Sequence, residues 1–267
     1  MALSPEGATP FVVGAARIVL GTLTLALFCL FLRQKVIFIG WPWKWVMLYA
    51  VCVWAYQIVF FSAVDLIGVA AGTLIAQGSV PIFAGGVQWL IYRQAPSKIW
   101  YAEAAVGILG LALINGTSGA SFSLPGFVCA LLAGFITAMD FVAAKKVAVY
   151  RSPLEGMLIV MLFASALMAP FFFLFPASWI FTPKGAFCMG MLGIFNCGAA
   201  FLLQFIGMKT TSPAMASVIA LAEPLGAALI GILILHETAD MMTFLGASCL
   251  FASVALAVVR PEKDIRA

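Results

Sequence analysis

Apolar residues are gathered along this chain into nine long blocks that are separated by short polar segments. Each block is close to the ~17–25 apolar residues that a helix needs to cross a bilayer. The blocks cover residues 12–32, 44–64, 69–92, 99–115, 123–145, 154–175, 185–206, 213–235 and 241–259. The pattern predicts an all-α membrane protein, a polytopic helical bundle with nine transmembrane helices.

The blocks repeat at a constant offset of 143 residues. Residue pairs at this offset include Pro10 and Pro153, Phe28 and Phe171, Ala71 and Ala214, Pro81 and Pro224, and Ala84 and Ala227. The counterpart of block 123–145 would lie upstream of Met1, so the first repeat lacks its first helix. We therefore predict two five-helix repeats, residues 1–118 and 119–267, joined by a Gly/Ser turn near Asn115–Phe122.

Composition supports a membrane protein and excludes several function classes. The chain is 64% hydrophobic and 9% charged, with a mean hydropathy of +1.14, which exceeds what a soluble domain of this length can bury. Six cysteines lie within or beside apolar blocks without a C-x-x-C pair, and the chain has one histidine. We therefore expect no structural disulfide, metal site or cofactor. The net charge of +4 gives no indication of a nucleic-acid partner.

Lys and Arg are distributed unevenly between alternating connections. Twelve of the fourteen lie in one set: Arg33, Lys35, Lys44, Arg93, Lys98, Lys145, Lys146, Arg151, Lys209, Arg260, Lys263 and Arg266. The other set contains only Lys184, and Arg17 lies about one turn inside the first block. The positive-inside rule then places the C-terminus in the cytoplasm and the N-terminus of this chain outside, in an inner or plasma membrane. Because a complete repeat has an odd number of helices, the second repeat is inverted relative to the first.

Polar residues inside the blocks are candidate functional residues, because each costs free energy in lipid unless it faces protein or a cavity. Glu223 is the eleventh residue of its 23-residue block, ~16 Å along the helix and near the bilayer midplane. Pro224 cannot donate to the carbonyl of Ala220, which predicts a free acceptor at the same depth, and Pro81 has the same relation to Gln77. Secondary transporters with inverted repeats bind their substrate at this depth. We predict a substrate or proton role for Glu223, with a neutral structural acid as the alternative.

Weaker candidates lie on the other blocks. The predicted substrate or proton pathway comprises Glu223, Pro224, Ala220, Gln77, Pro81, Thr73, Gln57, Trp54, Asn196, Arg17 and Asp140. For Thr73 and Gln77 the alternative is close helix packing, which stripes of small and polar residues commonly serve. Arg17 is either a charge in the cavity or a side chain that snorkels outward. The partner of Asp140 is undetermined, because the positions three and four residues further on are alanines.

The residues around Glu223 carry a family resemblance. The run Ala222–Leu229, followed by Leu235–Thr238 and block 241–259, resembles the last two helices of EamA-family members of the drug/metabolite transporter superfamily. Gly14–Arg17 and the Pro81 helix are similar to the second and fourth helices of that family. The resemblance covers essentially the whole chain. It implies a ten-helix inner-membrane protein with inverted five-helix repeats, typically an exporter of small metabolites such as amino acids.

The sequence departs from the family pattern in three places. The first helix is absent, Tyr92-Arg93-Gln94 stands where a Gly-Glu pair is usual, and His236 takes a Gly position. A start codon placed too late, a genuine nine-helix variant and a gene remnant each explain the missing helix.

We therefore predict a secondary-active transporter that exports small metabolites by alternating access, with a proton as the hypothesised coupling ion. The expected partners are a small-molecule substrate and the lipid bilayer, and a homodimer is left open. One alternative is a non-transporting remnant or partner subunit. Another is an intramembrane lipid-modifying enzyme, which is disfavoured because the chain has no acidic cluster and no Gly-rich phosphate loop, so no catalytic residue is expected.

Overall fold

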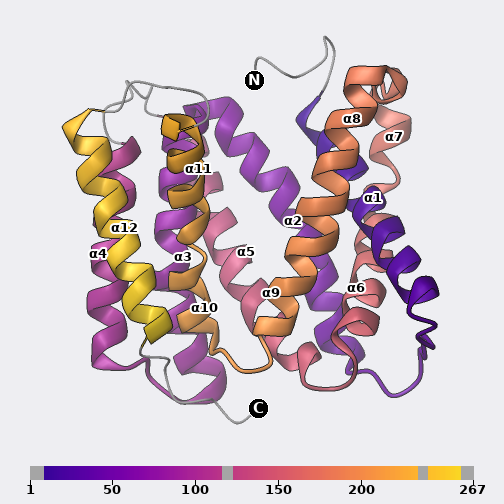
Figure 1. The fold of residues 1–267 in the computed structure, drawn as a ribbon, viewed down its shortest axis with the longest axis horizontal. Coiled ribbons are helices and arrows are strands. Elements are labelled where there is room, and N and C mark those ends of the chain that lie inside the picture. Colours follow the sequence, from indigo (N-terminus) through magenta and orange to yellow (C-terminus); the bar gives the residue numbers. More distant parts are fainter. Residues whose placement is uncertain (1–8, 116–122, 234–239, 260–267) are drawn as a thin grey trace. The chain divides into compact units, whose positions relative to one another are not determined.

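The computed structural model describes residues 9–115, 123–233 and 240–259, and every regular element in these ranges is a helix (Figure 1). The elements are α1 (Pro10–Phe31), α2 (Trp43–Ile67), α3 (Val69–Tyr92), α4 (Lys98–Asn115), α5 (Leu124–Ala148), α6 (Pro153–Met168), α7 (Phe171–Leu174), the 3₁₀-helix η1 (Ser178–Phe181), α8 (Pro183–Met191), the π-helix η2 (Leu192–Ala200), α9 (Phe201–Gly207), α10 (Pro213–Ile219), α11 (Ala222–Leu233) and α12 (Met241–Val259). Most of the predicted joint between the repeats, residues 116–122, and His236 lie outside the described residues.

Eight helical segments within the described ranges are long and apolar enough to cross a membrane. Each corresponds to one predicted block. The remaining block forms α4, whose 18 residues include Lys98 and Glu103 and which is not among the eight. The prediction of an all-α polytopic bundle is confirmed, whereas the count of nine spans is not.

Local sequence explains where several helices begin. Proline is the first residue of α1, α6, α8 and α10, where its missing N–H has no helical partner to lose. The hydroxyls of Thr182 and Ser212 accept hydrogen bonds from the third residue of the helix that follows, at 3.1 Å in both cases. A single residue, Gly68, separates α2 from α3. Its φ of +84° lies in the region that glycine adopts without a steric penalty.

Helices related by the offset of 143 pair with each other. Thr22 Oγ1 of α1 lies 2.7 Å from Ser165 Oγ of α6, and these two positions are 143 residues apart. Equivalent residues of two repeats meet only on the two-fold axis that relates the repeats. Phe11, near the start of α1, stacks on Phe171 after the end of α6, so the two helices run antiparallel.

The α4–α12 pair, which lies side by side in Figure 1, repeats this symmetry. Ser253 Oγ donates to the backbone carbonyl of Glu103 at 2.7 Å, and a Cβ on Gly110 would lie only 2.7 Å from the carbonyl oxygen of Gly246. The offset of 143 converts the pair 110 and 246 into the pair 253 and 103. The two contacts are therefore equivalent under the repeat, and they lie toward opposite ends of the α4–α12 pair. This arrangement shows that the two helices run antiparallel, as an inverted repeat requires.

The chain divides into two compact units. Unit 1 comprises residues 1–61 and 143–209, and unit 2 comprises residues 62–142 and 210–267. Each unit therefore takes helices from both sequence repeats, and α2 and α5 contribute residues to both units. Unit 1 contains the candidates Arg17, Trp54, Gln57 and Asn196, and unit 2 contains Thr73, Gln77, Pro81, Asp140, Ala220, Glu223 and Pro224.

Candidate functional site

In unit 2, Glu223 lies at a break in its membrane span. Helices α10 and α11 are separated by two residues, Ala220 and Leu221. The N–H of Leu221 donates to the carbonyl of Val218 at 3.1 Å, so this bond spans three residues where an α-helix spans four. Glu223 and Pro224 then form the first turn of α11, with Pro224 buried and the Glu223 side chain exposed.

The carbonyl of Ala220 is occupied, so the prediction that it is a free acceptor is wrong. The N–H of Glu223 donates to it at 3.0 Å. The reason is that the backbone tightens at this point, and Glu223 supplies the N–H that Pro224 lacks. Glu223 itself is the eleventh of the 21 residues of the span Pro213–Leu233. A carboxylate side chain and an interrupted helix therefore coincide at mid-span.

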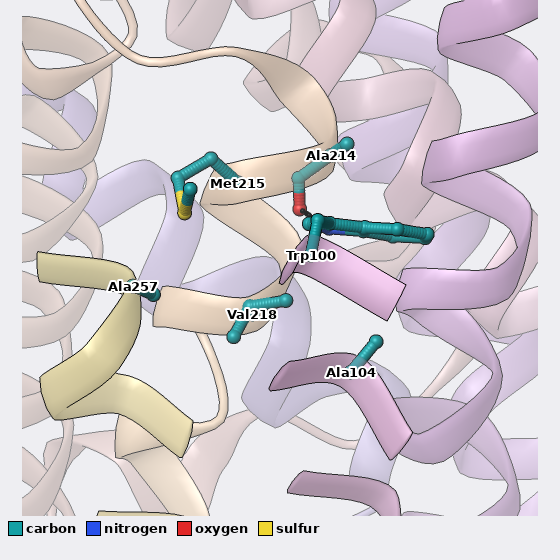
Figure 2. Packing of buried hydrophobic residues seen from close by; sticks show 6 residues of the cluster. All are labelled: Trp100, Ala104, Ala214, Met215, Val218 and Ala257. Carbon is teal, nitrogen blue, oxygen red and sulfur yellow. Dashed lines mark hydrogen bonds between the residues drawn. The ribbon is translucent and has the colours of Figure 1, made fainter. Parts of the chain in front are cut away.

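Buried side chains of α3 and α4 fix the start of α10. Gln88 Oε1 accepts a hydrogen bond from the N–H of Ala214, and Trp100 Nε1 donates to the carbonyl of Ala214, both at 2.8 Å. Figure 2 shows the indole of Trp100 directed at this carbonyl. The surrounding cluster comprises Trp100, Ala104, Ala214, Met215, Val218 and Ala257.

In contrast to the span of Glu223, α3 continues through Pro81 without a break. Pro81 is buried, whereas Thr73 and Gln77 are partly exposed. A Cβ on Gly134 of α5 would clash with Ser79, so α3 and α5 pack closely at this point. Gln77 Oε1 is buried without a hydrogen-bond partner in the described part of the chain. It remains available as an acceptor, and Thr73 and Gln77 stay predicted pathway residues.

Asp140 is partly exposed on α5, close to the C-terminal turns of that helix. Three residues before it, the hydroxyl of Thr137 donates to the carbonyl of Ala133 at 3.0 Å. Among the described residues, no three His, Cys, Asp or Glu side chains gather so as to hold a metal ion. A role for Asp140 in the pathway stays a prediction.

In unit 1, the structure brings together two candidates that lie 40 residues apart. Arg17 Nη2 of α1 donates to Gln57 Oε1 of α2 at 2.6 Å. Gln57 is 2% exposed, and a Cβ on Gly14 would lie 3.1 Å from the same oxygen. Glycine at position 14 therefore leaves room for the Gln57 amide beside α1. Trp54, three residues earlier on α2, is partly exposed, and its Nε1 is buried without a hydrogen-bond partner within the described ranges.

Asn196 lies in the π-helix η2, which packs closely against α1. A Cβ on Gly21 would lie 2.5 Å from the Cβ of Cys197, and a Cβ on Gly198 would lie 2.9 Å from Thr24. Asn196 is partly exposed, and its Oδ1 lies 3.7 Å from the sulfur of Cys197. A π-helical turn inside a span commonly marks a functional position. No hydrogen bond among the described residues joins Asn196 to Arg17 or Gln57.

Sequence reasoning missed one buried acid of unit 1. Glu155, in the first turn of α6, is 4% exposed and accepts a hydrogen bond from the N–H of Ile37 at 2.7 Å. The indole of Trp41 donates to the carbonyl of Ile37 at 2.7 Å. These bonds hold the α1–α2 connection against α6. The only sequence signal was an acid in the first turn of a helix, which does not identify a tertiary partner.

Three of the cations assigned to cytoplasmic connections also bind backbone carbonyls within unit 1. Lys145, 1% exposed, donates to the carbonyl of Lys209 at 3.0 Å. Lys209 donates to the carbonyl of Arg151 at 3.2 Å, and Arg151 donates to the carbonyl of Ile39 at 3.0 Å. These bonds link the connections that follow α1, α5 and α9, so the three connections lie at one end of unit 1.

The helices, their antiparallel equivalents and the mid-span polar residues define a polytopic membrane protein of the inverted-repeat transporter class. Residues 1–116 and 124–259 match the EamA-like transporter family, and the chain belongs to this family. It is 30% identical over 264 residues to the uncharacterized transporter YwfM of Bacillus subtilis strain 168, covering 98% of this chain and 89% of that protein. It is 26% identical over 200 residues to an uncharacterized transporter of Archaeoglobus fulgidus, covering 74% of this chain and 70% of that protein.

A crystal structure of a protein with 20% sequence identity shares the fold, with a TM-score of 0.81 over 95% of this chain and 90% of the other. The chain is therefore a multi-pass membrane transporter by family, and the family points away from an enzyme.

Proposed function

We propose that the chain is a secondary-active transporter that exports small metabolites, such as amino acids or related compounds, by alternating access. The observation that carries the proposal is the helix break at Ala220 and Leu221, which precedes Glu223 in the middle of its span. Interrupted helices at mid-membrane depth form the substrate and ion sites of many secondary transporters. A carboxylate at such a break can hold the ammonium group of a solute or a proton, but not both at once.

Glu223 is proposed as the residue that couples transport to a proton. An exposed carboxylate at mid-span can exchange its proton with whichever side of the membrane the cavity faces. Competition between solute and proton for one carboxylate then drives the export of solute by the uptake of protons. The proposed orientation places the C-terminus and the connections after α1, α5 and α9 in the cytoplasm of an inner or plasma membrane.

The test is transport by purified protein in proteoliposomes with an imposed pH gradient. A mixture of radiolabelled amino acids is loaded inside, and release is followed with and without the gradient. We expect gradient-dependent release from the wild type. In Glu223→Gln, which keeps shape and hydrogen bonding but cannot ionise, this release should fall to that of protein-free liposomes while expression and folding persist.

The matched control is Asp65→Asn, which removes an exposed carboxylate at the end of α2 in the same unit. This variant should retain the pH response. If Glu223→Gln transports at the wild-type rate with the same pH dependence, Glu223 is a structural acid and the proton coupling is wrong.

A further inference from the structure

Arg17 is a charged residue held inside a membrane span. It is the eighth residue of the 22-residue helix α1, ~10 Å from the start of that helix. Its guanidinium makes one hydrogen bond among the described residues, to the neutral amide of the buried Gln57. A guanidinium at this depth is costly unless it meets an anion or water.

Four buried side-chain atoms in the described part of unit 1 have no hydrogen-bond partner: three N–H donors and the hydroxyl of Thr9, which can donate or accept. Arg17 Nε is buried without a hydrogen-bond partner within the described ranges, and so are Trp54 Nε1 and Trp179 Nε1. Trp54 lies one helical turn from Gln57, and Trp179 packs in a cluster with Ala16, the neighbour of Arg17. Buried N–H groups are normally paired, so a set of unpaired donors calls for an acceptor that is not part of these helices.

Unit 1 does not supply that acceptor as a carboxylate. Among its described residues the only acid is Glu155, which binds the N–H of Ile37 beyond the C-terminal end of α1. Arg17 lies in the N-terminal half of α1, 14 residues before the last residue Phe31, or ~21 Å along the helix. Glu155 is therefore at the far end of α1 and does not neutralise Arg17.

We propose that Arg17 and Gln57 bind the carboxylate of the transported solute. Arginine presents a planar fork of N–H donors that fits a carboxylate with two parallel hydrogen bonds, and Gln57 Oε1 holds that fork in place through Nη2. The substrate class is then small carboxylic acids, including amino acids. An analogue in which an uncharged amide replaces the carboxylate should be rejected. This assignment rests on the proposed function, since it names the chemical class of the solute.

The first test builds the missing acceptor into the protein and needs no ligand. In Gln57→Glu the amide that touches Arg17 becomes a carboxylate of nearly the same shape. We expect the Tm of the purified protein in detergent to rise by roughly 2–4 °C at neutral pH, because an uncompensated charge gains its counterion.

The matched control is Gln204→Glu. Gln204 is partly exposed in α9 of the same unit. Contacts of Leu20 with Gly193 and of Thr24 with Gly198 show that η2 runs parallel to α1, which places Gln204 well beyond the level of Arg17. This variant should not raise the Tm. If Gln57→Glu lowers the Tm as Gln204→Glu does, Arg17 already has an anionic partner and the assignment is wrong.

The second test separates the assignment from the proposed function. Proteoliposomes are loaded with a mixture of the twenty amino acids or with the matched mixture of their α-amides. We expect release of acids but not amides by the wild type, loss of acid release in Arg17→Gln and partial retention in Arg17→Lys. Equal release of both mixtures by the wild type overturns the carboxylate assignment and leaves the transporter proposal standing. If neither mixture is released, the proposed function fails for this class of solute, and the Tm comparison alone decides the assignment.

Discussion

Single glycines determine how closely α4 and α12 approach. A Cβ on Gly110 would lie 2.7 Å from the carbonyl oxygen of Gly246 and 2.8 Å from the backbone N of Leu250. Both atoms belong to the backbone and cannot move away cheaply. We predict that Gly110→Ala destabilises the protein by about 1–3 kcal/mol, measured as a lower Tm in detergent.

The control is Gly86→Ala in α3 of the same unit, where a Cβ would meet nothing within 4 Å. Alanine should leave the Tm unchanged or raise it there, because it favours a helix by about 1 kcal/mol over glycine. Equal losses in both variants would mean that the effect is a general response to alanine and not a contact between α4 and α12.

Individual side chains could be selected as candidates from their depth in the apolar blocks. Glu223 was selected from its position before a proline and Arg17 from its charge, and their roles in transport stay predictions. Their partners could not be found this way. The bond from Arg17 to Gln57 spans 40 residues, and that from Ile37 to Glu155 spans 118. Such pairs depend on which helices pack against each other, and the apolar pattern of a single segment does not determine its neighbours.

At the scale of elements, the start of α12 is set by a charged cap. Thr243 donates to Asp240 Oδ1 through its hydroxyl at 2.7 Å and through its N–H at 2.8 Å. These bonds, the hydroxyl first, lower the pKa of Asp240 below its ordinary value of 3.8. The ionised cap therefore stabilises the helix above that ordinary value, and the contribution is lost as the pH falls through the lowered pKa.

We predict that wild-type protein has a higher Tm than Asp240→Asn at neutral pH and that the difference shrinks as the pH falls below the ordinary value of 3.8 and is lost once the pH has passed through the lowered pKa. Asparagine keeps an acceptor oxygen at the cap but does not ionise, so the comparison isolates the charge. Thermal unfolding in nanodiscs across this pH range measures it. A difference that persists unchanged in acid would show that the carboxylate's ionisation plays no part in capping.

Helix bounds were predictable from the repeat, and helix interruptions were not. The offset of 143 carries α1, residues 10–31, onto residues 153–174, which are the bounds of the corresponding span. The same offset carries the unbroken α3 onto α10 and α11, which are separated at Ala220. It also carries part of the α-helical α2 onto the π-helix η2. Apolar length determines where a span lies, whereas a break or a π-turn depends on packing against neighbouring helices.

For the whole molecule, the sequence repeats and the compact units are different divisions. The predicted repeats are contiguous, residues 1–118 and 119–267, and their boundary stays a prediction. Each compact unit instead combines a helix with its inverted equivalent, as the pair Thr22 and Ser165 shows in unit 1. The offset of 143 identifies which helices of the two repeats are equivalent. It does not determine which of these equivalent helices contact each other. That choice depends on the glycines and hydroxyls that face each other across the axis.

The orientation of the chain in the membrane gives the last prediction. The bonds among Lys145, Lys209 and Arg151 hold the connections after α1, α5 and α9 at one end of unit 1. These connections and the adjoining turns of α2 and α5 carry seven of the nine Lys and Arg residues of that unit. The positive-inside rule assigns such an end to the cytoplasm. We predict that a reporter fused after Arg266 is cytoplasmic and that single cysteines at Ser118 or Asp240, in a cysteine-free background, react with an impermeant maleimide from outside intact cells. A cysteine at Lys146 should react only after the membrane is opened, and labelling of that position in intact cells would overturn the assigned orientation.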